Sequence, residues 1–218
     1  MTDGVSDGAM TDGAGAPAPP HAGFDPELRI DWLGAEELAD GRPGRLGLTF
    51  LPGKRGPSMR YPGHLYRRDA ARDLAEMRER GVLRLILLVE DAELVSWGDP
   101  RIVEIGRRHG LEVRRFPVPD GSPPGSLAEM DAILDAVEDA RAHGDAVLAC
   151  LGGVGRTGLV AACALMRAGR TVAEAIRRVR EVRHPTAVET PAQEAFAERY
   201  AAYLRAGRGA SGARSGEG

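Results

Sequence analysis

AVLACLGGVGRTGLVAACAL, residues 146–165, joins one apolar run to another through a glycine-rich turn. The first run ends at Cys150, and five residues separate this cysteine from Arg156. Thr157 and Gly158 then lead into a stretch with helical spacing of apolar residues. In a strand, turn and helix of this kind, backbone N–H groups and the helix N-terminus both favour an anion. The stretch therefore predicts a phosphate-binding loop at the end of a strand.

Predicted strands and helices alternate before this loop, and only helices follow it. The predicted strands are 45–51, 83–90, 111–118 and 145–150, and the predicted helices are 67–81, 99–110, 126–144, 157–168, 171–183 and 190–205. This alternation predicts an α/β fold whose central, mostly parallel sheet is flanked by helices. Ligands of such sheets bind beyond the carboxyl ends of the strands, and Cys150 is expected at such an end.

The composition is typical of a globular protein, with 43% hydrophobic and 28% charged residues. A net charge of −3 gives no indication of nucleic-acid binding, and no run reaches the roughly 18 apolar residues of a membrane span. Two cysteines make no disulfide framework, which favours a reducing cytoplasm. Residues 1–23 and 206–218 are predicted to be disordered tails around one domain, 24–205. Frequent Ala, Gly and Arg favour a bacterial origin.

Three kinds of phosphate site use a glycine-rich turn before a helix. Gly153, Gly155 and Gly158 spell G-x-G-x-x-G, but a dinucleotide site also needs a second strand with an acidic residue about 20 positions on. Glu174 has that spacing and lies in a predicted helix, which disfavours this interpretation. A nucleotide P-loop needs G-K-[ST], and Gly158 is followed by Leu159. The pattern Cys-x5-Arg remains.

The chemistry of Cys-x5-Arg accounts for each part of the loop. The Cys150 thiolate is a nucleophile, and loop N–H groups together with the helix N-terminus favour its ionised form. The Arg156 guanidinium can bind two phosphate oxygens through its planar fork. The Thr157 hydroxyl is expected to donate to the cysteine sulfur and help it leave. This chemistry needs no metal or cofactor, and the histidines show no metal-ligand spacing. The expected phosphate-binding residues are Leu151, Gly152, Gly153, Val154, Gly155 and Arg156.

CLGGVGRTG, residues 150–158, resembles the signature of the cysteine-dependent protein tyrosine and dual-specificity phosphatases. Further stretches resemble, in order, the cyclin-dependent-kinase-associated branch of that family: GRLGLTFLPGKRG (44–56), FPVPDGSPP (116–124), GRTGLVAACALM (155–166) and AVETPAQ (187–193). The likeness covers about residues 30–203. It implies a phosphotyrosine-protein-phosphatase-like fold. It also implies hydrolysis of phosphotyrosine on a protein substrate through a phosphocysteine intermediate, with phosphoserine and phosphothreonine as further candidates.

The resemblance assigns roles to two residues outside the loop. Asp120, thirty residues before Cys150, takes the place of the general acid, although an ordinary Asp-Gly turn is the alternative. Gln193 matches a glutamine that orients the attacking water, although Thr190 and Gln193 also fit a helix cap. Cys163 lies roughly 10 Å along the helix from its start, and we expect a small core residue.

Ala149 departs from the family pattern, which usually has histidine before the nucleophile. That histidine helps to fix the loop and favours the thiolate, so Ala149 predicts a slower enzyme with its pH optimum shifted upward. It also leaves open a binding module that reads phosphate with little turnover. A rhodanese or an arsenate reductase is disfavoured, because the former rarely needs the Arg-Thr-Gly helix start and the latter needs a resolving cysteine closer than Cys163. Substrate identity and oligomeric state stay open.

Overall fold

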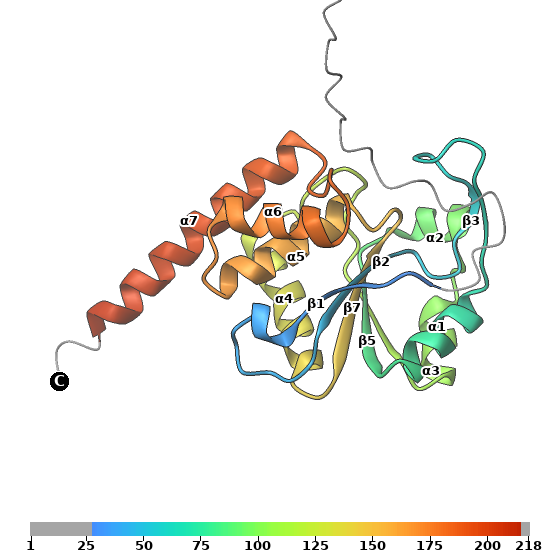
Figure 1. The fold of residues 1–218 in the computed structure, drawn as a ribbon, viewed down its shortest axis with the longest axis horizontal. Coiled ribbons are helices and arrows are strands. Elements are labelled where there is room, and N and C mark those ends of the chain that lie inside the picture. The colour runs from blue at the N-terminus through green and yellow to red at the C-terminus, as the bar shows by residue number, and fades with distance from the viewer. Residues whose placement is uncertain (1–27, 215–218) are drawn as a thin grey trace, which may run out of the picture.

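A five-stranded sheet forms the centre of the computed structural model, which describes residues 28–214 and their side chains as far as residue 207 (Figure 1). The strand order is β1 (Asp31–Leu33), β2 (Leu46–Phe50), β7 (Asp145–Cys150), β5 (Val82–Leu87) and β6 (Glu112–Arg115). β1 runs antiparallel to β2, and the other neighbours are parallel. The predicted α/β fold with a mostly parallel sheet is thus confirmed.

The central strand β7 carries the cysteine to the carboxyl edge of the sheet. In the register, Phe50 of β2 lies beside Cys150, and Leu87 of β5 lies beside Ala149. The last five of the six residues of β7, from Ala146 to Cys150, are buried, because helices cover β7 on both faces. The ends of three parallel strands therefore meet where the predicted site begins.

Helices cover the two faces of this sheet (Figure 1). One face packs against α4 (Leu127–Arg141) and α5 (Gly155–Arg167), and α6 (Val172–Val182) and α7 (Pro191–Arg214) pack around α5. The other face packs against α1 (Ala70–Glu79) and α3 (Ile102–Arg108). Smaller elements complete the description: η1 (Ala35–Glu37), α2 (Asp91–Trp97), β3 (Arg55–Pro57) and β4 (Leu65–Arg67), the last two forming a separate hairpin.

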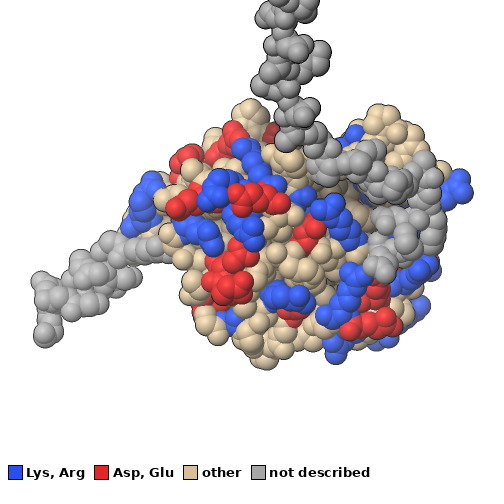
Figure 2. All heavy atoms as spheres, viewed as in Figure 1, with Lys and Arg blue, Asp and Glu red and all other residues tan. Residues whose placement is uncertain are grey.

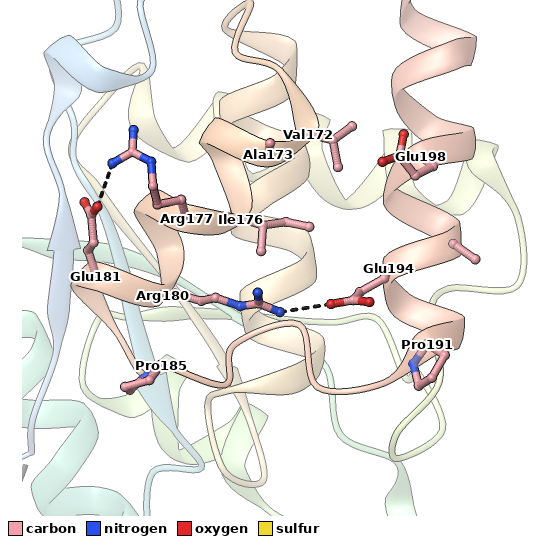
Figure 3. A pocket seen from close by; sticks show the side chains of 11 residues that line it. Val172, Ala173, Ile176, Arg177, Arg180, Glu181, Pro185, Pro191, Glu194 and Glu198 are labelled. Atoms are coloured by element: carbon pink, nitrogen blue, oxygen red, sulfur yellow. Dashed lines mark hydrogen bonds and ion pairs between the residues drawn. The ribbon is translucent and has the colours of Figure 1, made fainter. Parts of the chain in front are cut away.

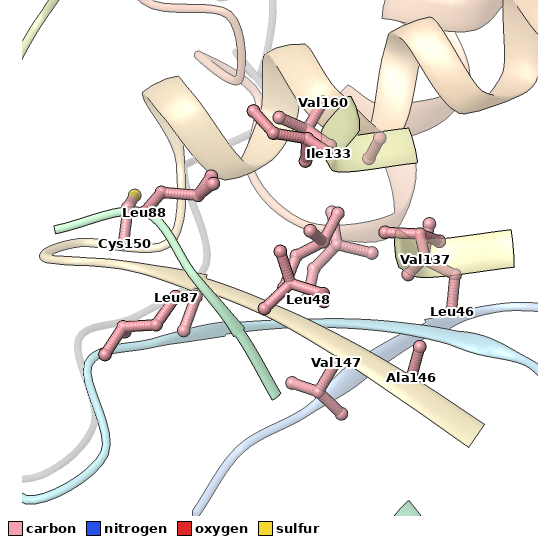
Figure 4. Close-up of a cluster of buried hydrophobic side chains, with 14 of the residues drawn as sticks. Leu46, Leu48, Leu87, Leu88, Ile133, Val137, Ala146, Val147, Cys150 and Val160 are labelled. Carbon is pink, nitrogen blue, oxygen red and sulfur yellow. The ribbon is translucent and has the colours of Figure 1, made fainter. Parts of the chain in front are cut away.

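The apolar core lies between β2, β7 and β5 and the helices. Figure 4 shows Leu46 and Leu48 of β2 close to Val137 of α4, with Val147 on the other side of β7. These side chains are fully or almost fully buried, and each contributes roughly 1.5–3 kcal/mol to stability relative to an exposed position. Cys150 ends its strand at the margin of this cluster, where the core gives way to the site.

Two capping patterns explain where the longer helices begin. The Ser126 hydroxyl accepts the Glu129 N–H at the start of α4. At α6, Thr171 and Glu174 form a reciprocal capping box. The predicted helix at 99–110 begins later, at Ile102, because the Asp99 carboxylate accepts the Arg101 N–H and closes a turn first.

Some elements differ from those the sequence predicts. α7 continues to Arg214, so the helix end expected at residue 205 is wrong. Residues 206–214 contain three glycines, which disfavour a helix, but their three alanines and two arginines favour one. The expected tail at 1–23 and the last residues, 215–218, lie outside the described residues. β1, β3 and β4 have only three residues each, too few for a periodic pattern. α2, which lies within a stretch expected to be a loop, is a helix of seven residues.

Charges of both signs are interspersed on the face of the molecule drawn in Figure 2. Many charged side chains of the described residues form ion pairs, for example Arg177 with Glu181 and Arg180 with Glu194. No helix in the described part of the chain is both long enough and apolar enough to cross a membrane.

Candidate active site

Cys150 is the last residue of β7 and is almost fully buried. The Gly153 N–H donates to its Sγ atom at 3.2 Å, so the loop already directs a positive dipole at the sulfur. α5 begins at Gly155, two residues before the expected start at 157. The loop is therefore short, and the positive end of a helix of thirteen residues follows it directly.

The three loop glycines differ in how closely they pack against the rest of the protein. Gly153 has φ +68°, and a Cβ atom there would lie 2.3 Å from the Thr49 carbonyl oxygen. A Cβ atom at Gly155 would lie 2.5 Å from an Oε2 atom of Glu189. At Gly152 a Cβ atom would meet nothing within 4 Å. Two of the glycines thus let the loop fold tightly onto β2 and the segment before α7.

Arg156 is 2% exposed and is held by two separate segments. Its Nη1 and Nη2 atoms donate to the two carboxylate oxygens of Glu93 at 2.7 and 2.6 Å. Nη1 also donates to the Val118 carbonyl at 2.8 Å, and Nη2 pairs with an Oδ1 of Asp120 at 2.9 Å. Burial lowers the pKa of Arg156, but its bond with Glu93 and the charges of Cys150, Glu93 and Asp120 outweigh burial and raise it.

Glu93 is a site residue that the sequence analysis missed. It lies on α2, and its carboxylate also accepts the Glu90 N–H at 2.9 Å. A bidentate carboxylate fixes both the position and the plane of a guanidinium. Glu93 therefore orients Arg156. The available signal was indirect: a buried arginine in a phosphate loop needs a carboxylate partner, and the sequence does not say which one.

Asp120 lies where the expected acid should be, close to the arginine of the phosphate loop. Its side chain is 63% exposed, and its carboxylate pairs with Arg156. The first turn of α7 holds the loop that carries it: the Thr190 hydroxyl donates to the Gly121 carbonyl at 2.9 Å, and Gln193 Nε2 donates to the Ser122 carbonyl at 3.4 Å. The structure thus brings Cys150, Arg156 and Asp120 to one edge of the sheet.

Gln193 and Thr157 are both buried, and their contacts differ from those expected. Gln193 Oε1 accepts the Glu189 N–H at 2.9 Å, so both ends of its amide already have partners. Its backbone N–H donates to the Thr190 hydroxyl, which is half of the expected cap. Thr157 Oγ1 has no hydrogen-bond partner among the described residues, so the expected bond to the sulfur is absent here. Because α5 begins early, Thr157 lies inside its first turn.

Arg183, at the end of α6, holds the phosphate loop from outside. Its Nε atom donates to the Gly153 carbonyl at 2.8 Å, and Nη2 donates to the Gly152 carbonyl at 3.4 Å. Nη1 pairs with Asp31 of β1 at 2.7 Å. The sequence analysis did not identify Arg183 as a site residue. Its side chain is buried, and it fixes the carbonyls of Gly152 and Gly153 by hydrogen bonds.

Lys54 is a second cation of the site that the sequence analysis missed. It is 8% exposed, and its Nζ atom lies 4.3 Å from the centre of the Tyr66 ring. Burial, with a smaller effect of the Arg60 charge, lowers its pKa to about 8, although the charges of Cys150 and Asp120 raise it. Lys54 follows the end of β2, where Phe50 lies beside Cys150, so this buried cation lies at the same edge of the sheet as the nucleophile.

Cys163 is a fully buried free thiol on α5, as is expected of a small core residue. Burial raises its pKa far above the ordinary value.

Within residues 28–214, no group of three or more His, Cys, Asp or Glu side chains is arranged to hold a metal ion. A separate groove of about 830 Å³ lies between α6 and α7. Figure 3 shows Val172, Ile176 and Glu198 among the side chains that line it. The groove contains none of the expected site residues.

Comparison with known proteins decides the family. Residues 60–170 match the family model described as "Polymorphic toxin system, DSP-PTPase phosphatase". The chain belongs to the dual-specificity phosphatase family. It is 29% identical to "Cyclin-dependent kinase inhibitor 3" of Rattus norvegicus over 186 residues, 81% of this chain and 82% of the relative. The Homo sapiens protein of that name is 25% identical over 183 residues, with the same shares.

Solved structures of dual-specificity and tyrosine phosphatases share the fold. Kinase associated phosphatase, with serine in place of its catalytic cysteine, aligns with a TM-score of 0.73 at 23% identity, covering 84% of this chain and 99% of that one. "Tk-PTP in the active form" aligns with a TM-score of 0.58 at 30% identity, covering 75% and 93%. The family assignment makes the chain a cysteine-dependent protein phosphatase, and the non-catalytic binding module is not favoured.

Proposed function

We propose that this phosphatase hydrolyses phosphotyrosine on a protein, with phosphoserine and phosphothreonine as further substrates, through a phosphocysteine at Cys150. One observation carries the assignment of roles. Arg156, six residues after the nucleophile, is held between Glu93 and the loop of Asp120. A nucleophile, an oriented guanidinium and a carboxyl group therefore meet around one position.

In the first step, the Cys150 thiolate attacks the phosphorus atom. The S–P bond forms as the ester O–P bond breaks. The N–H groups of residues 151–156 and the guanidinium of Arg156 hold the three non-bridging oxygens. Asp120, protonated at this stage, gives its proton to the leaving oxygen. Because Asp120 is exposed, it can exchange that proton with solvent.

In the second step, water releases phosphate from the sulfur. The Asp120 carboxylate takes a proton from the water, whose oxygen attacks phosphorus as the S–P bond breaks. Gln193 is proposed to hold this water, because it lies against the loop: a Cβ atom at Gly155 would be 3.1 Å from its Nε2. The Thr157 hydroxyl, which lacks a partner among the described residues, is available to the departing sulfur.

Asp120 occupies a place on Arg156 that a phosphate oxygen would take. In the structure its carboxylate pairs with Nη2, while Glu93 holds the other side of the guanidinium. Phosphate binding is therefore proposed to displace Asp120 from Arg156 and leave it facing the ester oxygen. The backbone is held on both sides of the acid, at Val118 and at the carbonyls of Gly121 and Ser122, so the proposed movement is confined to the exposed side chain of Asp120.

A phosphorylated protein is the proposed partner, supported by relatives named as a cyclin-dependent kinase inhibitor and a kinase associated phosphatase. Those names describe the relatives, and which phosphoprotein this chain acts on is not carried over. The cytoplasmic location and the bacterial origin stay predictions. Both cysteines are free, which agrees with a reducing compartment.

The test is hydrolysis of p-nitrophenyl phosphate by the native protein, Cys150→Ser, Asp120→Asn and the matched control Cys163→Ser. We expect Cys150→Ser to abolish turnover and Asp120→Asn to lower kcat by roughly 10²–10⁴-fold, the usual contribution of a general acid. Cys163→Ser should keep turnover, because that thiol is outside the site. Phosphotyrosine and phosphothreonine peptides then establish the preference. Turnover that survives in Cys150→Ser would refute the proposal.

A further inference from the structure

Lys54 lies in a rigid turn directly after β2, whose last residue, Phe50, pairs with Cys150. The Lys54 N–H donates to the Leu51 carbonyl at 3.2 Å, and the Arg68 N–H donates to the Lys54 carbonyl at 3.0 Å. The backbone of this turn is thus held on both sides.

A buried ion pair fixes the same turn from below. The Gly53 N–H donates to the Asp73 carboxylate at 2.7 Å, and that carboxylate pairs with Arg68 at 2.8 Å. Gly53 has φ +72°, and a Cβ atom there would lie 2.6 Å from Ala70. These bonds hold the backbone of Lys54 shortly after Phe50, the neighbour of Cys150 in the sheet. The Tyr66 ring, which the Lys54 ammonium contacts, lies 5.4 Å from the Phe50 ring, centre to centre.

The ammonium of Lys54 is buried without a carboxylate partner among the described residues. It lies over the Tyr66 ring, and the charges of Cys150, Arg60 and Asp120, from three separate segments of the chain, act on its pKa. Burying an unpaired cation is unfavourable. A contact with one aromatic ring offsets only part of this cost. The arrangement is accounted for if an anion completes it.

The charge balance of the site calls for such a cation. Glu93 pairs with Arg156 through both carboxylate oxygens and neutralises its charge. A phosphate ester dianion that enters beside Cys150 thus meets a guanidinium already compensated. Lys54 supplies a positive charge that forms no ion pair with a carboxylate among the described residues.

We propose that Lys54 is a second cationic ligand of the substrate phosphoryl group, acting together with Arg156. This inference rests on the proposed function, because it assumes that the phosphoryl group binds over Cys150. The ammonium would donate to a non-bridging oxygen from the β2 side, while Arg156 binds from α5. The alternative is a packing role, in which the lysine only covers Tyr66.

The charge of Lys54 gives the proposal a pH signature. With a pKa of about 8, its ammonium is charged at pH 7 and loses its proton as the pH rises through that value. Oxyanion affinity should therefore fall between pH 7 and 9. Arginine at this position keeps its charge throughout. Arg60, Cys150 and Asp120 also face the group, and they are common to every variant compared.

The experiment measures binding of tungstate, a tetrahedral dianion over this pH range, by calorimetry. The proteins are the native chain, Lys54→Met, Lys54→Arg and the control Arg55→Met, which removes the same charge from an exposed neighbour. At pH 7 we expect about tenfold weaker binding for Lys54→Met, the usual size of one charge-assisted hydrogen bond, and no change for the control. At pH 9 the native affinity should approach that of Lys54→Met, and Lys54→Arg should lose less.

Steady-state kinetics separate ligand binding from packing. Removal of a phosphoryl ligand that acts equally in the ground and transition states raises KM and leaves kcat little changed, so Lys54→Met should raise KM by about tenfold. Tungstate affinity equal to that of the native chain in Lys54→Met would overturn the proposal. If the native chain binds tungstate without turning over substrate, the proposed function fails. The difference in tungstate affinity between the native chain and Lys54→Met then still tests whether Lys54 binds the oxyanion. If it binds no tungstate at all, both fail.

Discussion

At the scale of single residues, the site is built by pairing each charged group with a fixed partner. Arg156 is buried, and burying its charge would be unfavourable without Glu93, whose two carboxylate oxygens accept hydrogen bonds from both Nη atoms. Gly153 accepts a backbone conformation that other residues avoid, and in return its N–H reaches the sulfur. Chemical identity and backbone geometry are thus equally necessary in this loop.

Replacing Glu93 by glutamine should weaken catalysis through Arg156. The amide keeps the shape but gives up the negative charge and one acceptor, so the guanidinium loses its orientation. We expect kcat/KM to fall by about tenfold or more, the usual effect of a lost charge-assisted bond. The measurement is p-nitrophenyl phosphate kinetics, with exposed Glu104→Gln as control. Unchanged kinetics together with unchanged tungstate affinity would show that Glu93 does not position Arg156.

Replacing Gly153 by alanine should damage both stability and activity. The new methyl group would overlap the Thr49 carbonyl oxygen, and φ +68° costs a further 1–2 kcal/mol or so for a residue with a Cβ atom. Gly152→Ala is the matched control for stability, since nothing lies within 4 Å of its Cβ position. Denaturant unfolding compares the two. Equal free energies of unfolding would contradict the packing described for the loop.

At the scale of elements, helices that are distant in sequence are tied together by a polar cluster around Asp131. Arg167 of α5 pairs with Asp131 of α4 at 2.6 Å, and the hydroxyl groups of Tyr200 and Tyr203 of α7 donate to the same carboxylate. Burial raises the pKa of Asp131, but these bonds outweigh burial and lower it. The cluster fixes α7, whose first turn holds the loop of Asp120.

The lowered pKa of Asp131 predicts that the free energy of unfolding decreases at acidic pH. The contribution is fully present above the unfolded value of about 3.8 and is lost as the pH falls through the lower folded value. Asp131→Asn should lower the free energy of unfolding at pH 7 by about 1–3 kcal/mol and flatten its decline below pH 4. Asp135→Asn, whose 70% exposed carboxylate also pairs with Arg167, is the control with a smaller effect. Equal losses in both variants would contradict this account.

The parts of the site that were predicted from sequence are those whose signal is local. The strand at 145–150 and the loop from Cys150 to Arg156 are one contiguous pattern, and Asp120 lies in a turn rich in proline and glycine. Glu93 and Lys54 carry no such pattern. Glu93 meets Arg156 across 63 residues of sequence, and only the packing of α2 against the carboxyl edge brings them together. Such partners depend on tertiary structure and could not be predicted from spacing.

At the scale of the whole molecule, the fold separates two thiols by environment. Cys150 lies at the carboxyl edge of the sheet, against the loop, whereas Cys163 is enclosed where α5 packs against the core. Burial raises the pKa of Cys163, so its reactive thiolate is scarce at neutral pH. One fold thus contains a thiol placed for chemistry and another that serves only packing.

Alkylation of the native protein should accordingly modify Cys150 and leave Cys163 intact. Peptide mapping after iodoacetamide treatment at pH 7 measures this, and tungstate should protect Cys150 by occupying the loop. Unfolding in denaturant should make Cys163 react as well, because its protection comes from burial. Modification of Cys163 in the folded protein at the rate of Cys150 would contradict the described core.

The phosphocysteine intermediate is the central claim, and trapping it is the most direct test. The native protein is mixed with p-nitrophenyl phosphate, quenched in acid within the first turnover and digested for mass spectrometry. The account predicts one phosphoryl group on the peptide that contains Cys150, more of it in Gln193→Ala if Gln193 holds the hydrolytic water, and none in Cys150→Ser. If the native protein forms product while no phosphoryl group is detected on Cys150 at any quench time, the result would contradict the account.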